Sequence, residues 1–113
     1  MNRDDKTVFR VGRFSVPSGA EAEFLRVVFE INAFLRSMPG CLQLRVLKQP
    51  RSAPDVNYMT IAQWRDSAAL QSAQAAVAAK HKEMNFEPQE MQSRLGIKAE
   101  SGDYAPLDAG EHG

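Results

Sequence analysis

The spacing of the apolar residues switches between the period of a strand and the period of a helix in a fixed order. A Val- and Phe-rich run over 8–16 contains no proline and ends at a Pro-Ser-Gly cluster, which predicts a strand. Ser18 and Glu21 then form a capping-box pattern at the start of a helix. Pro39 and Gly40 end this helix, because proline cannot continue its hydrogen-bond ladder. The apolar stripe of the helix comprises Phe24, Val27, Val28, Ile31, Leu35 and Met38.

Two further strands and a second helix follow. We expect a strand over 41–49, where apolar and polar residues alternate, and another over 57–64, which contains aromatic residues. The polar segment between them is bracketed by two prolines and joins them as a hairpin. Asp66 and Ser67 are good N-cap residues for an alanine-rich helix that runs to about Met84. This helix is amphipathic, with only a narrow apolar stripe.

The predicted order is therefore strand, helix, strand, strand, helix, strand. We expect the last strand over 93–100, after a loop or a short helical turn in 85–92. This is the order of the ferredoxin-like βαββαβ subunit, an α+β fold in which a four-stranded antiparallel sheet carries two helices on one face. We expect one domain over 8–100, a flexible N-terminus at 1–7 and a C-terminal tail at 101–113.

Both faces of the predicted sheet carry apolar side chains. In the third strand, Tyr58 and Trp64 lie on one face, whereas Met59 and Ile61 lie on the other. An antiparallel sheet with one face in water alternates more cleanly between apolar and polar residues. Two helices cannot cover both faces, so we expect a second copy of the chain to cover the other one. The prediction is a homodimer whose sheets form a dimeric α/β barrel.

Composition excludes several classes of function. The chain has 113 residues, 43% apolar and 25% charged, as in one globular domain. Fourteen Lys and Arg balance fourteen Asp and Glu, which argues against nucleic acid as a partner. We expect no membrane partner and a cytoplasmic protein, because no segment approaches the ~20 apolar residues of a membrane span. With Cys41 as the only cysteine and no nucleotide-binding motif, we expect no metal and no cofactor.

Two short motifs carry a resemblance to a known family. The sequence MPGCL stands at the helix-to-strand turn over 38–42, and AQWRD at 62–66 leads into AAL at 68–70. With these motifs, the chain resembles the antibiotic biosynthesis monooxygenase-like (ABM domain) group of the dimeric α/β-barrel proteins, over nearly the whole of 8–100. The resemblance implies a cavity lined by the tryptophan at the end of a strand, which is Trp64 in this sequence.

The resemblance also implies a type of chemistry. The family includes cofactor-independent oxygenases of aromatic phenols and anthrones, in which an asparagine earlier on the same strand face accompanies the tryptophan. Thr60 stands at that place here. Its haem-degrading members use an asparagine on the first strand and a histidine about ten residues after the tryptophan, where this chain has Gly12 and Gln74. Both patterns are altered, which argues against haem degradation and removes the usual polar partner of the cofactor-independent oxygenases.

Five residues are candidates for the site. Trp64, Tyr58 and Thr60 share one strand face, and we expect them to bind an aromatic ring and its oxygen substituents. Arg45 is a candidate for holding an oxygen that becomes negative during the reaction, and His81 has a pKa suited to taking a proton from a phenol. Each has a structural alternative: core packing for the first three, an intersubunit or solvated ion pair for Arg45, and a surface position for His81.

Arg10 and Arg13 on the first strand are similar to Arg45 as candidates. The resemblance and these residues leave two functions open. The first is a cofactor-independent, monooxygenase-like enzyme, a possible oxidoreductase, acting on a small aromatic or quinonoid compound that supplies its own electrons. The second is a non-catalytic homodimer that binds a small molecule or has an accessory role.

Overall fold

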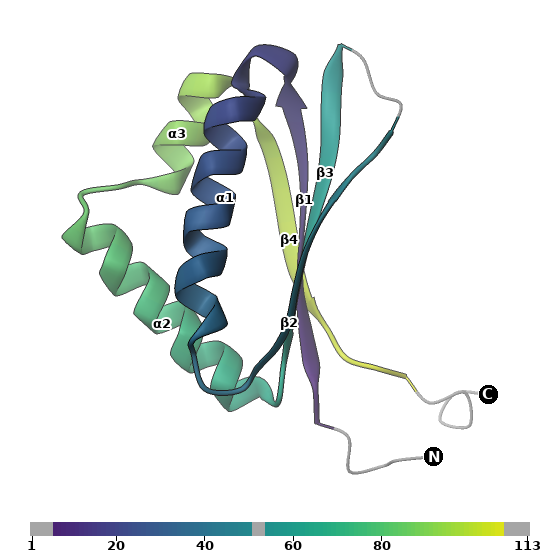
Figure 1. Cartoon of the computed structure of the whole chain (residues 1–113), viewed down its shortest axis with the longest axis vertical. Coiled ribbons are helices and arrows are strands. Elements are labelled where there is room, and N and C mark those ends of the chain that lie inside the picture. Colours follow the sequence, from purple (N-terminus) through teal and green to yellow (C-terminus); the bar gives the residue numbers. More distant parts are fainter. Residues whose placement is uncertain (1–5, 51–53, 108–113) are drawn as a thin grey trace.

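The computed structural model describes residues 6–50 and 54–107 of the chain. Three α-helices lie on one side of a four-stranded antiparallel sheet (Figure 1). The elements in chain order are β1 (Val8–Pro17), the short 3-10 helix η1 (Ser18–Ala20), α1 (Glu21–Arg36), β2 (Cys41–Lys48), β3 (Asp55–Trp64), α2 (Ser67–Glu83), α3 (Pro88–Leu95) and β4 (Lys98–Tyr104). The ferredoxin-like subunit is confirmed, with a third helix inserted before the last strand.

The strands lie in the order β2-β3-β1-β4. β1 is central and pairs with both β3 and β4, so that Gly12 lies between Thr60 and Ser101. β2 and β3 form the expected hairpin. This order places β3, β1 and β4 next to one another in the sheet, and the helices lie on one side of it (Figure 1).

The last strand differs from the prediction at both ends. Part of the expected strand at 93–100 belongs to α3, which starts with Pro88 at its first turn and ends at Gly96. Proline suits a helix start, and Gly96 has the left-handed backbone (φ 73°) that ends many helices. β4 then continues to Tyr104, because it pairs with β1 as far as Phe9. The predicted tail is therefore wrong for 101–104, and the predicted segments 1–5 and 108–113 lie outside the described residues.

One of the two predicted helix caps is confirmed. Asp66 caps α2, where its Oδ1 accepts a hydrogen bond from the Ala69 backbone N–H at 2.8 Å. The capping box at Ser18 is wrong, because Ser18 lies in η1 and α1 begins without a side-chain cap. Glu21 instead accepts a hydrogen bond from the Tyr58 hydroxyl and pairs with Lys48 Nζ at 3.2 Å.

The helix-covered side of the sheet holds two separate groups of buried residues. The first core lies where η1, α1 and α3 meet the sheet, and consists of Val16, Ala20, Phe24, Val56, Tyr58, Met91 and Ile97. The second core lies under α2 and consists of Trp64, Ala69, Leu70 and Ala73. The two cores occupy opposite ends of β3, and the space between them contains the candidate site.

The other side of the sheet, here called the open face, is not covered by any helix of the described chain (Figure 1). Phe9, Val11, Met59 and Ile61 are half-buried there, and Leu47 is 41% exposed. A bulge in β2 between Cys41 and Gln43 shifts the register, and Leu42 at this bulge is 53% exposed.

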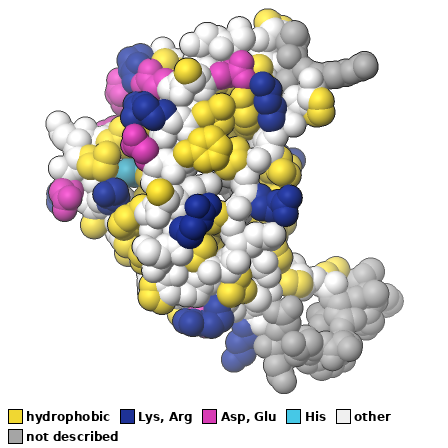
Figure 2. Space-filling view, in the orientation of Figure 1, with side chains coloured by type: hydrophobic (Ala, Val, Ile, Leu, Met, Phe, Trp, Pro, Cys, Tyr) yellow, Lys and Arg dark blue, Asp and Glu magenta, His cyan; other side chains and the backbone are white. Residues whose placement is uncertain are grey.

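On the face seen in Figure 2, the Asp and Glu side chains lie mainly in the upper part of the view, whereas Lys and Arg side chains are spread over it. That view also shows hydrophobic side chains gathered in its upper half. No helix within the described ranges is long and apolar enough to span a membrane.

Candidate active site

A cavity of about 670 Å³ lies between the sheet and the helices, and it extends from the second core toward β4 and α3. β1, β3 and β4 form its floor, whereas α2 and one end of α1 cover it and α3 closes one side. α2 diverges from the sheet along its length (Figure 1), which leaves room that the small side chains Ala73 and Ala78 do not fill. Leu35, Leu70 and Val77 make much of its wall apolar.

Trp64 forms the end of the cavity at the last position of β3. Its side chain is 1% exposed and packs among Val8, Leu35 and Ala62. The indole Nε1 is buried and has no hydrogen-bond partner among the described residues. A buried N–H without a partner costs about 1–3 kcal/mol, and most folded proteins avoid it. Trp64 therefore holds an N–H donor that a ligand oxygen could satisfy.

His81 lies on α2 and lines the same cavity. Its Nε2 is the other buried side-chain nitrogen that lacks a partner in the described part of the chain. The imidazole packs edge-on against the Phe86 ring, with ring centroids 5.0 Å apart. Burial lowers the pKa of His81, so the ring is neutral near pH 7. A neutral imidazole can accept a proton at Nε2 when Nδ1 carries the hydrogen.

Thr60 and Gly12 face each other across β3 and β1 on the floor of the cavity. A Cβ atom at Gly12 would lie 2.8 Å from Thr60 Oγ1 and 2.9 Å from Phe14 Cε1. Such distances are shorter than real Cβ contacts, so the floor has no room for a side chain at position 12. The glycine thus leaves space for the Thr60 hydroxyl, and the asparagine of the haem-degrading pattern could not fit at this position without a shift.

Arg10 also lines the cavity, next to β4. Its Nη1 donates to Asp103 Oδ1 at 2.8 Å, and its Nη2 donates to Ser101 Oγ at 3.0 Å. Arg10, Gly12 and Trp64 lie on the same face of the sheet, since Arg10 pairs with Ala62 and Val8 pairs with Trp64. Side chains alternate between the two faces along β1, so Arg13 lies on the open face, where it forms an ion pair with Glu100. The pairing of β1 with β3, counted from Trp64, therefore distinguishes Arg10 from Arg13.

The structure separates two of the predicted residues from the others. Tyr58 shares the helix-covered face with Trp64 but belongs to the first core, where it packs against Phe24 with ring centroids 5.1 Å apart. Burial and the Glu21 carboxylate raise the pKa of Tyr58 to about 12. Arg45 pairs with Ile61 and is exposed on the open face. Of the five candidates, Trp64, Thr60 and His81 line the cavity, whereas Tyr58 and Arg45 do not.

A second depression of about 630 Å³ lies at one end of the sheet and reaches the open face. Tyr58 borders it together with Arg13, Lys48 and Lys98. Unlike the cavity beside Trp64, it contains no buried side-chain nitrogen or oxygen without a partner among the described residues. The cavity is therefore the better candidate for a ligand site.

The sequence matches the antibiotic biosynthesis monooxygenase family over residues 7–82. The chain belongs to this family. No curated protein sequence matches it. Among solved structures, SnoaB from Streptomyces nogalater, a cofactor-independent oxygenase, is 26% identical with a TM-score of 0.65, and the match covers 95% of this chain and 99% of SnoaB.

Two more distant structures share the fold. Rv0793 from Mycobacterium tuberculosis is 16% identical with a TM-score of 0.62, and the match covers 91% of this chain and 97% of Rv0793. A dimeric ferredoxin-like protein from an uncultured marine organism is 8% identical with a TM-score of 0.68, and the match covers 91% of this chain and 98% of the other. The family resemblance expected from the sequence is thus confirmed.

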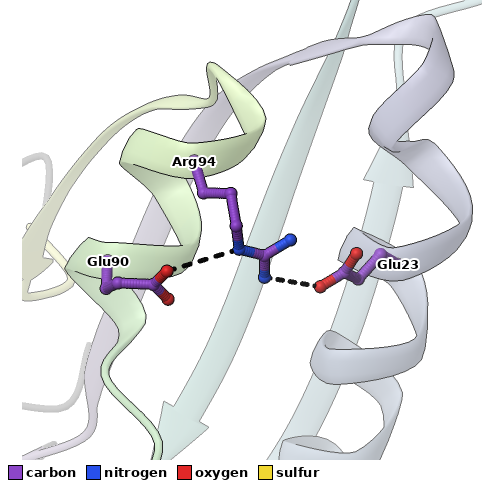
Figure 3. Close-up of polar contacts among 3 residues, drawn as sticks. All are labelled: Glu23, Glu90 and Arg94. Carbon is purple, nitrogen blue, oxygen red and sulfur yellow. Dashed lines mark hydrogen bonds and ion pairs between the residues drawn. The ribbon is translucent and has the colours of Figure 1, made fainter.

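In this family member, α3 supplies the side wall of the cavity through Pro88, Gln89 and Gln92. Arg94 holds α3 against α1: its Nη2 donates to Glu23 Oε2 at 2.8 Å and its Nε to Glu90 Oε1 at 3.3 Å (Figure 3). The Arg94 hydrogen bond lowers the pKa of Glu23. The pair with Glu23 joins α3, and thus this wall of the cavity, to α1, whereas the pair with Glu90 lies within α3.

The described residues contain no group of three or more His, Cys, Asp or Glu side chains that could hold a metal ion. Cys41 is half-buried beside the second core, and burial raises the pKa of its thiol. A thiol with a raised pKa is a weak nucleophile near pH 7. Among the residues that line the cavity, Trp64, His81, Thr60 and Arg10 are the candidates that the sequence offered.

Proposed function

We propose that this protein is a cofactor-independent monooxygenase that acts on a small aromatic or quinonoid compound. The observation that carries the proposal is the pair of buried nitrogen atoms without partners, Trp64 Nε1 and His81 Nε2, in two residues that line one cavity. A ligand with a hydroxyl and an acceptor oxygen would satisfy both atoms. The apolar wall formed by Leu35, Leu70 and Val77 suits a flat ring.

In the proposed reaction, His81 accepts the proton of a phenolic hydroxyl at Nε2. The resulting ring anion is electron-rich, and it transfers electrons to dioxygen. An activated ring C–H becomes a carbonyl while the phenol becomes the second carbonyl of a quinone. The substrate loses four electrons and dioxygen gains four, so one oxygen atom enters the product and the other leaves as water. This balance requires no external reductant and no cofactor.

Trp64 and Thr60 have supporting roles in this proposal. The indole N–H donates a hydrogen bond to the oxygen that becomes negative, and a donor placed in this way lowers the barrier to reaction. The Thr60 hydroxyl, which is next to Gly12 on the floor, can donate to a second substrate oxygen. The family membership and the likeness to SnoaB support the reaction type.

Oxygen consumption tests this proposal. The wild-type protein is mixed with a panel of hydroxylated naphthalenes and anthrones, and oxygen uptake and product mass are followed under ¹⁸O₂. We expect uptake with one labelled oxygen atom in the product. Because Trp64 is the only tryptophan, its fluorescence reports binding in the same experiment. Binding that quenches Trp64 without oxygen uptake would instead support the non-catalytic function.

We further propose that the protein is a homodimer that buries the open face. Phe9, Val11, Met59 and Ile61 give this face an apolar centre. Arg45 lies beside Ile61, where it would form intersubunit ion pairs rather than contact the substrate. Burial of such a patch between two copies stabilises a dimer through the hydrophobic effect.

Sedimentation of two variants tests the dimer. Ile61→Lys places a charge at the centre of the open face and should convert the dimer to a monomer. Phe29→Lys is the matched control, because Phe29 is a 55% exposed apolar residue on α1, away from the open face. A monomeric wild-type protein, or equal effects of the two variants, would contradict the proposed interface.

A further inference from the structure

Arg10 is the only Lys or Arg that lines the cavity within the described residues. A guanidinium group has five N–H donors in a fixed planar arrangement. Asp103 and Ser101 each take one of these donors. Three donors are therefore left for a ligand or solvent, and the Arg10 side chain is 40% exposed.

The two partners of Arg10 fix the direction of its guanidinium. Ser101 and Asp103 alternate along β4 and so lie on the same face of that strand, and Asp103 is the direct cross-strand neighbour of Arg10. The side chain therefore extends from β1 toward β4, whereas Trp64 lies on β3, the strand on the other side of β1. Strands β3 and β4 are roughly 10 Å apart, which is two inter-strand spacings. A ligand that lies on this floor would therefore contact Arg10 at one edge and Trp64 at the opposite edge.

The charges around Arg10 define the kind of group that it can bind. Asp103 neutralises much of the guanidinium charge. A carboxylate on the ligand would approach the Asp103 carboxylate, which already pairs with Arg10 at 2.8 Å. A neutral carbonyl oxygen accepts the same N–H donors without this repulsion.

We propose that Arg10 is a specificity-determining residue that binds a neutral carbonyl oxygen on the edge of the substrate opposite Trp64. The preferred ligand is then a keto-phenol, in which a hydroxyl and a ketone lie at opposite edges of a ring system. This inference rests on the proposed function, because it concerns the same cavity and the same class of ligand.

Calorimetric titration with two matched ligands tests the proposal. 6-Hydroxy-1-tetralone carries both oxygen groups, and 5,6,7,8-tetrahydro-2-naphthol has the same ring system without the ketone. We expect Arg10→Met to weaken binding of the tetralone roughly tenfold, because one hydrogen bond from a charged donor is lost. Binding of the naphthol should change less than about twofold.

Arg13→Met is the control, because Arg13 forms an equivalent β1–β4 ion pair on the open face. It should change neither affinity. Asp103→Asn adds a second test: it leaves the Arg10 charge uncompensated, so binding of 6-hydroxy-2-naphthoate should tighten relative to wild type.

The other possible results of these titrations show which part of the proposal is wrong. If Arg10→Met weakens both ligands equally, or if Arg13→Met has the same effect, the role of Arg10 is overturned while the cavity remains the binding site. If both ligands bind but Arg10→Met has no effect, the same conclusion holds. If the wild-type protein binds neither ligand, the proposed function is overturned together with this inference.

Discussion

Tyr58 and Trp64 lie on one face of the same strand, yet their surroundings are opposite. Tyr58 lies in the first core, where Phe14 and Phe24 pack as tilted rings with centroids 5.0 Å apart, and its hydroxyl donates to Glu21. Trp64 borders a cavity, and its indole N–H has no partner among the described residues. Filled space and paired polar groups stabilise a fold, whereas unpaired groups beside a cavity lower stability and favour ligand binding. One end of β3 therefore stabilises the fold, whereas the other end borders the cavity of the proposed active site.

The largest expected effect separates these two ends directly. Trp64→Phe keeps an aromatic ring but removes the N–H, so turnover in the oxygen assay should fall roughly a thousandfold, as for loss of an oxyanion donor. The free energy of unfolding, from urea denaturation, should fall by only about 1 kcal/mol. Tyr58→Phe serves as the control and should leave turnover within about twofold. Equal loss of turnover in both variants would contradict the assignment.

The second effect concerns pH at the functional end. Because burial lowers the pKa of His81, the folded protein keeps this ring neutral below pH 6.5, where the unfolded chain begins to bind a proton. The free energy of unfolding should therefore decrease as the pH falls below about 6.5, whereas kcat/KM should decrease only at lower pH, where His81 gains a proton in the folded protein. His81→Gln should lower kcat/KM roughly a hundredfold. It should also remove the acid limb of the rate profile, and an unchanged limb would exclude His81 as the base.

The third effect concerns pH at the stable end. The pKa of Tyr58 is raised to about 12 by burial and by Glu21, whereas an unfolded tyrosine titrates near pH 10. The unfolded chain thus loses a proton first, and the free energy of unfolding should decrease as the pH rises from about 10 to about 12. Tyr58→Phe should cost about 1–2 kcal/mol at pH 8. It should also reduce this alkaline decrease. Tyr104→Phe, at a residue 53% exposed, should do neither.

The smallest effect concerns the helix that connects the two ends. Arg94→Gln removes the ion pair that joins α3 to Glu23 on α1 and a second pair, with Glu90, within α3, but these side chains are partly exposed, so the loss in the free energy of unfolding should be small. High salt should reduce the difference. Arg26→Gln is the control, since Arg26 pairs with Glu30 within α1 and joins no two helices. Urea unfolding at low and high salt should show the larger loss for Arg94; an equal loss would mean that the contact to Glu23 adds nothing.

Local patterns were sufficient for most of the fold. The strands around 8–16 and 57–64 and the helix cap at Asp66 follow from alternation and side-chain chemistry. The errors arose where two signals competed. The alternating residues Leu95, Ile97 and Ala99 predict a strand, but Pro88 and Gly96 define a helix and its end. Ser18 and Glu21 match a capping box, but Tyr58, distant in sequence, binds the Glu21 carboxylate.

The site was harder to predict. The alternation of side chains along a strand indicates which residues share a face of the sheet, but it does not indicate which helix or cavity lies against each of them. Tyr58, Thr60 and Trp64 share a face as expected, yet α1 covers the first and the cavity lies against the other two. Arg45 and Arg10 were equivalent candidates in the sequence. Only the pairing of β1 with β3 and β4 places Arg10 beside the cavity and Arg45 on the open face.

The contact between Gly12 and Thr60 has a consequence for how this protein can evolve. Because a methyl group at position 12 would collide with the Thr60 hydroxyl, substitutions at the two positions are coupled. Gly12→Ala alone creates both this clash and one with the Phe14 ring; combining it with Thr60→Ala removes the collision with the hydroxyl and leaves only the ring to move aside. Related sequences that have acquired a side chain at position 12 should therefore carry a smaller residue opposite it, so that these two sites covary in any alignment of the lineage.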